Sequence, residues 1–270
     1  MFKTVFKPEL LLLITAFIWG FAFVAQTSAM DHIGPYSFNA LRFFLGSLSL
    51  VPVMFWLDSR PSKKRQYESM PTHSLLDRTH LVGGIVMGSV LFIAASLQQV
   101  GLLYTTAGNA GFITSLYIIF APIIGIFIGQ KTQANTWVGA VLALIGLYLL
   151  SVKGDFSISF GDLLQLIGAV FWALHILVIS HYSPKASSIK LSIIQFALCG
   201  ILSLFVGIAI ETFEFGAILN VLPELLYLGI LSTCVAYTLQ VVAQKNVPPA
   251  NAAIIFSLEA VFALLVVGCY

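Results

Sequence analysis

The sequence predicts an all-α polytopic membrane protein that is built from an inverted repeat of five helices. The first observation behind this prediction is composition: 59% of the residues are hydrophobic, only 9% are charged, and the mean hydropathy is +0.98. Soluble domains average roughly 45–50% apolar and about 25% charged residues. The second observation is that a helical hairpin in the first half of the chain returns in the second half.

Apolar runs of the length needed to cross a hydrocarbon core, about 20 residues, recur along the whole chain. We expect nine transmembrane helices, near residues 10–29, 37–57, 81–104, 109–130, 135–152, 161–182, 187–210, 222–243 and 249–270. A plan of five plus five helices requires a tenth, and the sequence predicts that this helix is missing. Either the chain is truncated, or another element packs in its place.

The repeated hairpin is detected by sliding residues 96–121 onto residues 238–263, a shift of 238 − 96 = 142 positions. Ten of the 26 aligned pairs are identical, and they include residue types that are rare in this chain, such as Gln98/Gln240 and Asn109/Asn251. The shift spans five predicted helices, and an odd shift makes the second copy enter the membrane from the opposite face. The sequence therefore predicts two inverted units, residues 1–155 and 156–270, as in secondary transporters.

The orientation follows from the Lys and Arg residues of the connections, which are enriched on the cytoplasmic side of membrane proteins. With a cytoplasmic N-terminus, eleven of the thirteen Lys and Arg residues lie inside, Lys153 lies outside and Arg42 lies within a span. We therefore expect a multi-pass protein of the inner (plasma) membrane with its N-terminus in the cytoplasm. The basic loop 58–80 is interpreted as a topology anchor, with binding of anionic lipid as the alternative.

Glu259 is the strongest candidate for a functional residue, because it is predicted near the middle of the last span. A charged side chain at that depth costs about 2.5–3.5 kcal/mol on insertion scales, so the carboxyl must face protein or a wet cavity. We expect it to exchange protons during transport; the alternative is a protonated carboxyl that forms a hydrogen bond between helices. Tyr117 is its counterpart in the repeat, since 117 + 142 = 259, and we expect the two side chains to face each other.

Two further pairs of equivalent residues belong to the predicted substrate or proton pathway. Asn109 and Asn251 begin the second helix of each hairpin, where free N–H groups bind anions, or where Asn acts only as a helix cap. Gln98 and Gln240 lie shortly before the hairpin tips and either bind substrate or form hydrogen bonds between helices.

Arg42, Trp19 and Trp172 complete the predicted pathway. Arg42 lies only about five residues inside its span, so we expect its side chain to reach outward to the interface, where it could attract anions to the outer mouth. The two Trp residues could line an apolar cavity, although packing in the core is the ordinary role of buried aromatic residues.

Several functions are excluded by what the sequence contains. The net charge of +2 and the absence of a basic tract interleaved with aromatic residues argue against nucleic-acid binding. Cys199, Cys234 and Cys269 all lie in apolar runs, and their spacing does not resemble that of zinc ligands, so we interpret them as small core residues. Neither a nucleotide-binding motif nor a hydrolase motif is present. We therefore expect no cofactor, no metal and no enzymatic activity.

The amino-acid sequences of several apolar stretches resemble those of a known family. They are AFIWGFAFV, ALRFFLGSL, GNAGFITSLYIIFAPIIGIFIGQK followed by NTWVGAVLALIGLYLLS, and NAAIIFSLEAVFALL. Together they resemble the EamA branch of the drug/metabolite transporter superfamily along nearly the whole chain. The resemblance implies a permease or exporter of ten helices with a central cavity, driven by a proton or substrate gradient. The chain departs from the family where Ala260 replaces the usual proline after the acidic residue.

The predicted function is therefore secondary transport of small metabolites, amino acids or drugs, by proton-linked or exchange alternating access. Its partners would be the small-molecule substrate and the lipid bilayer, with a homodimer left open. The alternative is a truncated, non-transporting membrane protein or a helper that needs a partner helix.

Overall fold

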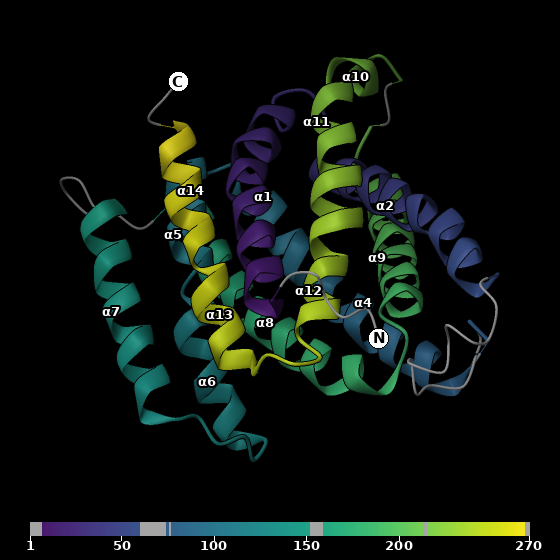
Figure 1. Cartoon of the computed structure of the whole chain (residues 1–270). Helices are drawn as coiled ribbons and strands as arrows, with labels where there is room; N and C mark the ends of the chain where they lie inside the picture. The colour runs from purple at the N-terminus through teal and green to yellow at the C-terminus, as the bar shows by residue number, and fades with distance from the viewer. Residues whose placement is uncertain (1–6, 60–73, 76, 152–158, 213–214, 268–270) are drawn as a thin grey trace.

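The computed structural model describes residues 7–59, 74, 75, 77–151, 159–212 and 215–267, which form a bundle of helices (Figure 1). The first half of the bundle contains α1 (Pro8–Ala29), α2 (Pro35–Asp58), α4 (Arg78–Gly101), α5 (Ala107–Thr114), α6 (Tyr117–Phe127) and α7 (Ala134–Ser151). The second half contains α8 (Phe160–Tyr182), the short 3-10 helix η1 (Ser183–Lys185), α9 (Ser188–Ile210), α10 (Phe215–Asn220), α11 (Leu222–Leu226), the π-helix η2 (Tyr227–Tyr237), α12 (Thr238–Ala243), α13 (Pro249–Phe256) and α14 (Leu258–Val267).

Within the described residues, eight helical stretches are long and apolar enough to cross a membrane. They coincide with eight of the nine expected spans. The remaining expected span, 135–152, corresponds to α7, whose apolar segment Ala134–Gly146 is shorter. Three of the stretches join two consecutive helices, α5 with α6, α8 with η1 and α13 with α14, and a fourth joins α11, η2 and α12. The basic cluster at 60–65 and Cys269 lie outside the described residues.

Local sequence explains where the helices begin. Proline occupies the first turn of α1, α2 and α13, where its missing N–H is not needed. Side chains cap three other helices: Asp77 accepts from Thr79 N at α4, Thr106 accepts from Asn109 N at α5, and Ser159 forms a capping box with Asp162 at α8.

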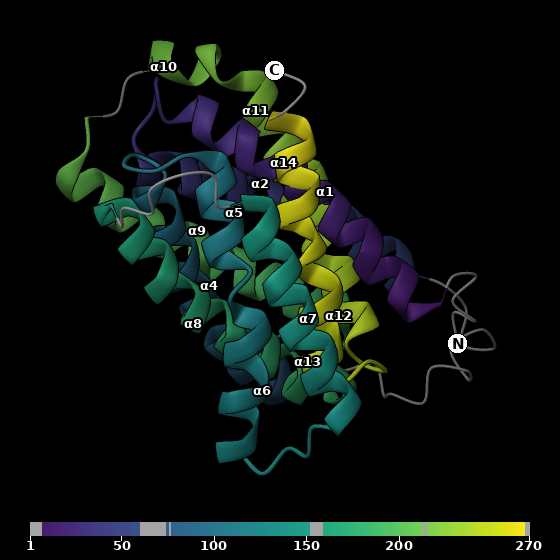
Figure 2. The same cartoon turned by 90° about the vertical axis from the view of Figure 1, so that its left-hand side faces the viewer.

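The helices of the two halves interleave, and equivalent helices pack in opposite directions. α5 lies against α14 and α6 lies against α13, so these two broken helices are antiparallel, with their breaks at the same depth (Figures 1 and 2). α2 and α9 form another long contact, and α7, at the left edge of the bundle in Figure 1, packs against α6 and α13. Most of the contacts that surround the centre of the molecule therefore join one half to the other.

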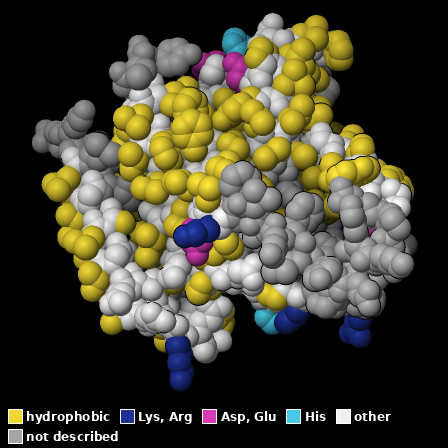
Figure 3. Space-filling model, viewed as in Figure 1, with side chains coloured by type: hydrophobic (Ala, Val, Ile, Leu, Met, Phe, Trp, Pro, Cys, Tyr) yellow, Lys and Arg dark blue, Asp and Glu magenta, His cyan; other side chains and the backbone are white. Residues whose placement is uncertain are grey.

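The surface of the bundle suits a lipid environment. Large apolar side chains are exposed on several helices, including Phe127, Leu149 and Ile208, which are 85%, 73% and 71% exposed. Figure 3 shows hydrophobic side chains over the flank of the bundle, while the Lys and Arg side chains visible on this face lie in its lower half. Inside, one large apolar cluster reaches from Leu11 of α1 to Phe256 of α13.

Candidate functional site

A narrow cavity lies at the centre of the bundle, where α1, α8, η2 and the two broken helices meet. Its volume of about 30 Å³ gives space for only a few water molecules. The lining residues come from both halves, and they include seven of the nine residues that the sequence singles out: Trp19, Arg42, Gln98, Tyr117, Trp172, Gln240 and Glu259.

Glu259 lies on the wall formed by the two broken helices. It is the second residue of α14, directly after the break that follows α13, and it is 4% exposed. Tyr117 begins α6 after the equivalent break, and its hydroxyl donates a hydrogen bond of 2.9 Å to Glu259 Oε1. The contact expected between these two equivalent residues is therefore present, and it gives the buried carboxyl a neutral partner.

α1 approaches this wall closely because residue 20 is a glycine. A Cβ atom at Gly20 would lie 2.8 Å from the carbonyl oxygen of Glu259 and would collide with Phe262 Cβ. The close approach brings the next turns of α1, with Phe23 and Gln26, to the cavity beside the carboxyl. A glycine at this position is needed for packing.

Arg42 lies on another wall, and here the expectation that its side chain reaches the outer interface is wrong. The residue is only 2% exposed. Its Nη1 donates to Gln26 Oε1 at 3.0 Å, its Nε donates to Asn39 Oδ1 at 2.9 Å, and the guanidinium lies 4.7 Å from the centroid of the Phe43 ring. These neutral amides and the ring replace water around the cation, so it is stable while facing the interior of the bundle.

Gln98 and Gln240 both line the cavity, as equivalent residues of the repeat. Gln98 donates to Gln26 Oε1 at 3.3 Å and accepts from Trp172 Nε1 at 2.8 Å, so it also connects α1, α4 and α8. Gln240 is 1% exposed, and within the described part of the chain its Oε1 accepts no hydrogen bond. A buried amide oxygen without a partner, facing a cavity, is available to a ligand or to water.

Aromatic rings form the remaining walls. Trp19 lies 4.7 Å from Tyr237 and 5.2 Å from Phe256, measured between ring centroids, and Trp172 lies 6.1 Å from Tyr237. Trp19 Nε1 donates to the carbonyl of Ser232 at 3.4 Å. The two Trp residues therefore pack in the core and line the cavity at the same time.

Asn109 and Asn251 lie away from the cavity and are exposed. Both occupy the third position of their helices, and neither is the N-cap residue, which is Thr106 for α5 and Pro248 for α13. Asn251 instead accepts a hydrogen bond of 3.0 Å from Thr136 of α7. The expectation that these residues cap their helices is therefore wrong, and neither of them lines the cavity.

Gln26, Tyr237 and Thr114 line the cavity and were not identified from the sequence. The presence of Gln26 within the apolar run of α1 was an available signal, because a polar side chain at membrane depth needs a partner. Tyr237 and Thr114 gave no such signal, since both residue types are common in apolar helices. Cys199 and Cys234 are buried free thiols, and no cluster of potential metal ligands occurs among the described residues.

Comparison with known proteins identifies the family. The sequence profile of the EamA-like transporter family matches residues 6–152 and again residues 159–267, which indicates an internal repeat. An uncharacterised transporter of Archaeoglobus fulgidus is 34% identical over 259 residues, covering 95% of this chain and 76% of its own. A second from that organism is 28% identical over 265 residues, covering 95% and 86%.

A protein of known crystal structure has the same fold, with a TM-score of 0.76 at 18% identity, over 97% of this chain and 88% of that one. The fold, the two profile matches and the relatives agree with one another. The chain belongs to the EamA-like transporter family and is a multi-pass membrane transporter, not an enzyme.

Proposed function

We propose that the chain is a secondary transporter that moves small metabolites, amino acids or drugs through the central cavity by proton-linked or exchange alternating access, of which the proton-linked form is the one tested below. It would lie in the inner membrane with its N-terminus in the cytoplasm. The single observation that carries the proposal is that a buried cation, Arg42, and a buried carboxyl, Glu259, line the same cavity while each is held by neutral partners.

An inverted arrangement of the units 1–155 and 156–270 supports alternating access. Equivalent helices would exchange their environments when the cavity closes on one side and opens on the other. The antiparallel packing of α5–α6 against α13–α14 and of α2 against α9 supports this arrangement. The Lys and Arg side chains that are visible in Figure 3 lie in the lower half of the bundle, and this bias supports a cytoplasmic N-terminus.

The chemistry of the walls suggests how a substrate is held. Arg42 would bind a carboxylate or another anionic group, because its present partners are amide oxygens that a charged oxygen can displace. Glu259 would carry the coupled proton or bind an amino group, and the rings of Trp19, Trp172 and Tyr237 would contact the apolar part. The small volume of the cavity means that the helices must separate for a substrate to enter.

The proposal is tested in proteoliposomes loaded with a pool of labelled amino acids and metabolites, with and without a pH gradient. Wild-type protein should give flux that depends on the gradient, and Glu259→Gln should lose this dependence because its side chain cannot exchange a proton. Glu9→Gln is the matched control, since Glu9 is an exposed carboxyl of α1, and it should behave as wild type. Gradient-dependent flux that survives in Glu259→Gln would contradict the role of this carboxyl, and lack of flux in all three proteins would contradict the transport function.

A further inference from the structure

α2 and α9 run antiparallel, and a carboxylate holds the start of α2 to the end of α9. Glu211 directly follows α9, and its Oε1 accepts from the backbone N–H of Tyr36 at 2.9 Å. Its Oε2 accepts from the N–H and the hydroxyl of Ser37 at 2.8 and 2.6 Å. No side chain of α2 itself caps its N-terminus, so Glu211 satisfies these N–H groups from the other half of the molecule.

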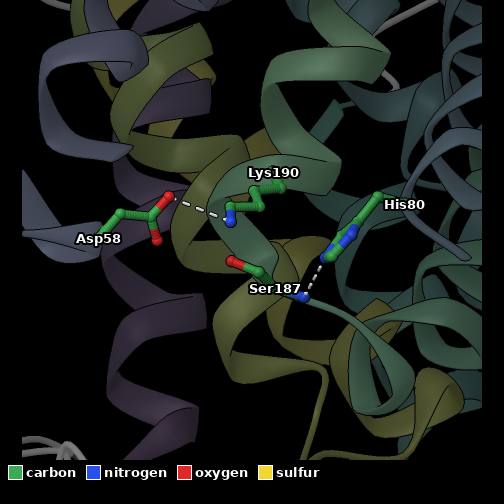
Figure 4. A network of polar contacts seen from close by, with 4 residues as sticks. All are labelled: Asp58, His80, Ser187 and Lys190. Carbon is green, nitrogen blue, oxygen red and sulfur yellow. Dashed lines mark hydrogen bonds and ion pairs between the residues drawn. The ribbon is translucent and has the colours of Figure 1, made fainter. Parts of the chain in front are cut away.

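A second carboxylate holds the end of α2 to the start of α9. Asp58 is the last residue of α2, and its Oδ2 lies 3.1 Å from Nζ of Lys190 in the first turn of α9 (Figure 4). Beside this ion pair, His80 of α4 accepts a hydrogen bond of 3.1 Å from the backbone N–H of Ser187, the residue before α9. The N-terminus of α9, like that of α2, is thus bound by side chains from the other half.

The two contacts are copies of each other. Trp19 and Trp172 define a shift of 172 − 19 = 153, and with this shift 58 becomes 211 and 37 becomes 190. Asp58 ends α2, the second helix of the first half, and binds Lys190, the third residue of α9. Glu211 follows α9, the second helix of the second half, and binds Ser37, the third residue of α2. The same shift relates Phe43 to Phe196, whose rings face each other with centroids 6.2 Å apart between the two contacts.

The surface between the two contacts is closely packed. A Cβ atom added at Gly200 of α9 would lie 3.0 Å from the Phe44 ring of α2, and Ser47 donates to the carbonyl of Ile193 at 3.1 Å. The cavity is lined by residues of α1, α2, α4, α8, η2, α12 and the broken helices, and by none of α9. A path from the cavity to either side of the membrane can therefore open without separation of α2 from α9.

We propose that α2 and α9 stay together throughout the transport cycle and form the axis about which the other helices of the two halves move. Asp58, Lys190 and Glu211 are then positioning residues that hold this pair at both ends. The inference rests on the proposed alternating access, and it adds which interface does not open. The contacts of α1 with α14, which border Glu259, belong to the interfaces that do open.

Cross-linking tests this inference in a variant in which all three cysteines are replaced by serine. One protein carries Ser37→Cys with Gly207→Cys, because a Cβ at Gly207 would lie 3.3 Å from Ser37 Oγ; a second carries Asp58→Cys with Lys190→Cys. Bridging each pair with a short bifunctional thiol reagent should lower flux by less than about twofold relative to the reduced protein. The comparison is Phe17→Cys with Phe262→Cys, whose parent rings lie 5.2 Å apart across α1 and α14, and this bridge should abolish flux. Loss of flux on bridging either α2–α9 pair would overturn the proposal.

A distance measurement tests the same inference without any flux, so that failure of the axis can be told from failure of the transport function. Spin labels at Leu48→Cys of α2 and Phe205→Cys of α9, both exposed positions, are measured in nanodiscs at acidic and neutral pH and with the metabolite pool. A single, unchanged distance in all conditions is the expected result. A second distance that appears in any of them would overturn the proposal, whether or not the protein transports.

Discussion

The two halves of this transporter bring equivalent residues together at the cavity but give them different chemistry. At one pair of positions the first half has Tyr117 and the second half has Glu259, and these two residues contact each other. The first half also places Arg42 at the cavity, whereas the equivalent residue of the second half is Gln195, since 42 + 153 = 195, and it lies on α9 outside the cavity lining. The repeat thus fixes where side chains meet, and a single change in one copy supplies the charge.

The backbone conformation also differs between equivalent segments of the two halves. The π-helix η2, Tyr227–Tyr237, corresponds to residues 85–95 of α4, which form regular α-helix, because 85 + 142 = 227 and 95 + 142 = 237. The π-helical turns carry Tyr237 and the Ser232 carbonyl, which contact Trp19 at the cavity. π-helical segments are frequent at functional sites. The irregular copy is thus the one that shapes the cavity on the side of α1.

Arg42→Gln removes the sharpest chemical difference between the halves, because the equivalent residue is already Gln195. A substrate with a carboxylate would lose a charge-assisted hydrogen bond worth about 1.5–3 kcal/mol, which is roughly 10- to 150-fold in affinity. Competition binding in nanodiscs checks this result, with Arg78→Gln, an exposed cation of α4, as the control. Unchanged affinity in Arg42→Gln would show that the guanidinium serves packing alone.

Gly20→Ala makes the first half resemble the second, where the equivalent residue is Ala173. We expect it to destabilise the fold by about 1–3 kcal/mol, because the added methyl group meets α14 at Phe262 and at the carbonyl of Glu259. Thermal unfolding in detergent measures the effect. Gly146→Ala is the matched control, since nothing lies within 4 Å of a Cβ at that position. Equal unfolding temperatures for the two variants would contradict the close contact of α1 with α14.

Tyr117→Phe removes the hydroxyl that pairs the two broken helices. The loss of one buried hydrogen bond should lower the free energy of unfolding by about 1 kcal/mol and leave Glu259 without its partner. We also expect the pH dependence of flux to shift, while Tyr148→Phe, at an exposed tyrosine of α7, leaves both measurements unchanged. A pH profile identical to that of the wild type would mean that the hydroxyl does not influence the carboxyl.

The smallest effects are expected at the two ends of α2 and α9, and they should be unequal. Glu211→Gln weakens three hydrogen bonds at a helix N-terminus and should cost about 1 kcal/mol. Asp58→Asn breaks one ion pair in which the Lys190 side chain is 9% exposed and the Asp58 side chain is 48% exposed. Water at Asp58 screens this pair, so we expect a loss in the range of exposed pairs, roughly 0.2–1 kcal/mol. Chemical denaturation of the two variants side by side should therefore give a lower free energy of unfolding for Glu211→Gln than for Asp58→Asn. The reverse order would contradict this comparison.

The sequence alone determined the membrane class, the spans and the repeat, because these depend on features that are local or periodic in the chain. Runs of apolar residues mark a membrane span wherever they occur, and the eight described spans lie within a few residues of the expected ones. The shift of 142 residues also predicted the contact between Tyr117 and Glu259, since equivalent residues near a twofold axis face each other.

Only the tertiary structure decided which faces of the helices turn toward the cavity. Arg42 is near the end of its span in the sequence, yet rotation of α2 points it inward, where Gln26 and Asn39 accept its hydrogen bonds. Asn109 and Asn251 are equivalent positions of the repeat, and Asn is a rare residue in this chain, yet both side chains are exposed and neither lines the cavity. In a helix that is apolar on all sides, the sequence contains no polar face to indicate its rotation, so the orientation is fixed by packing against the other half.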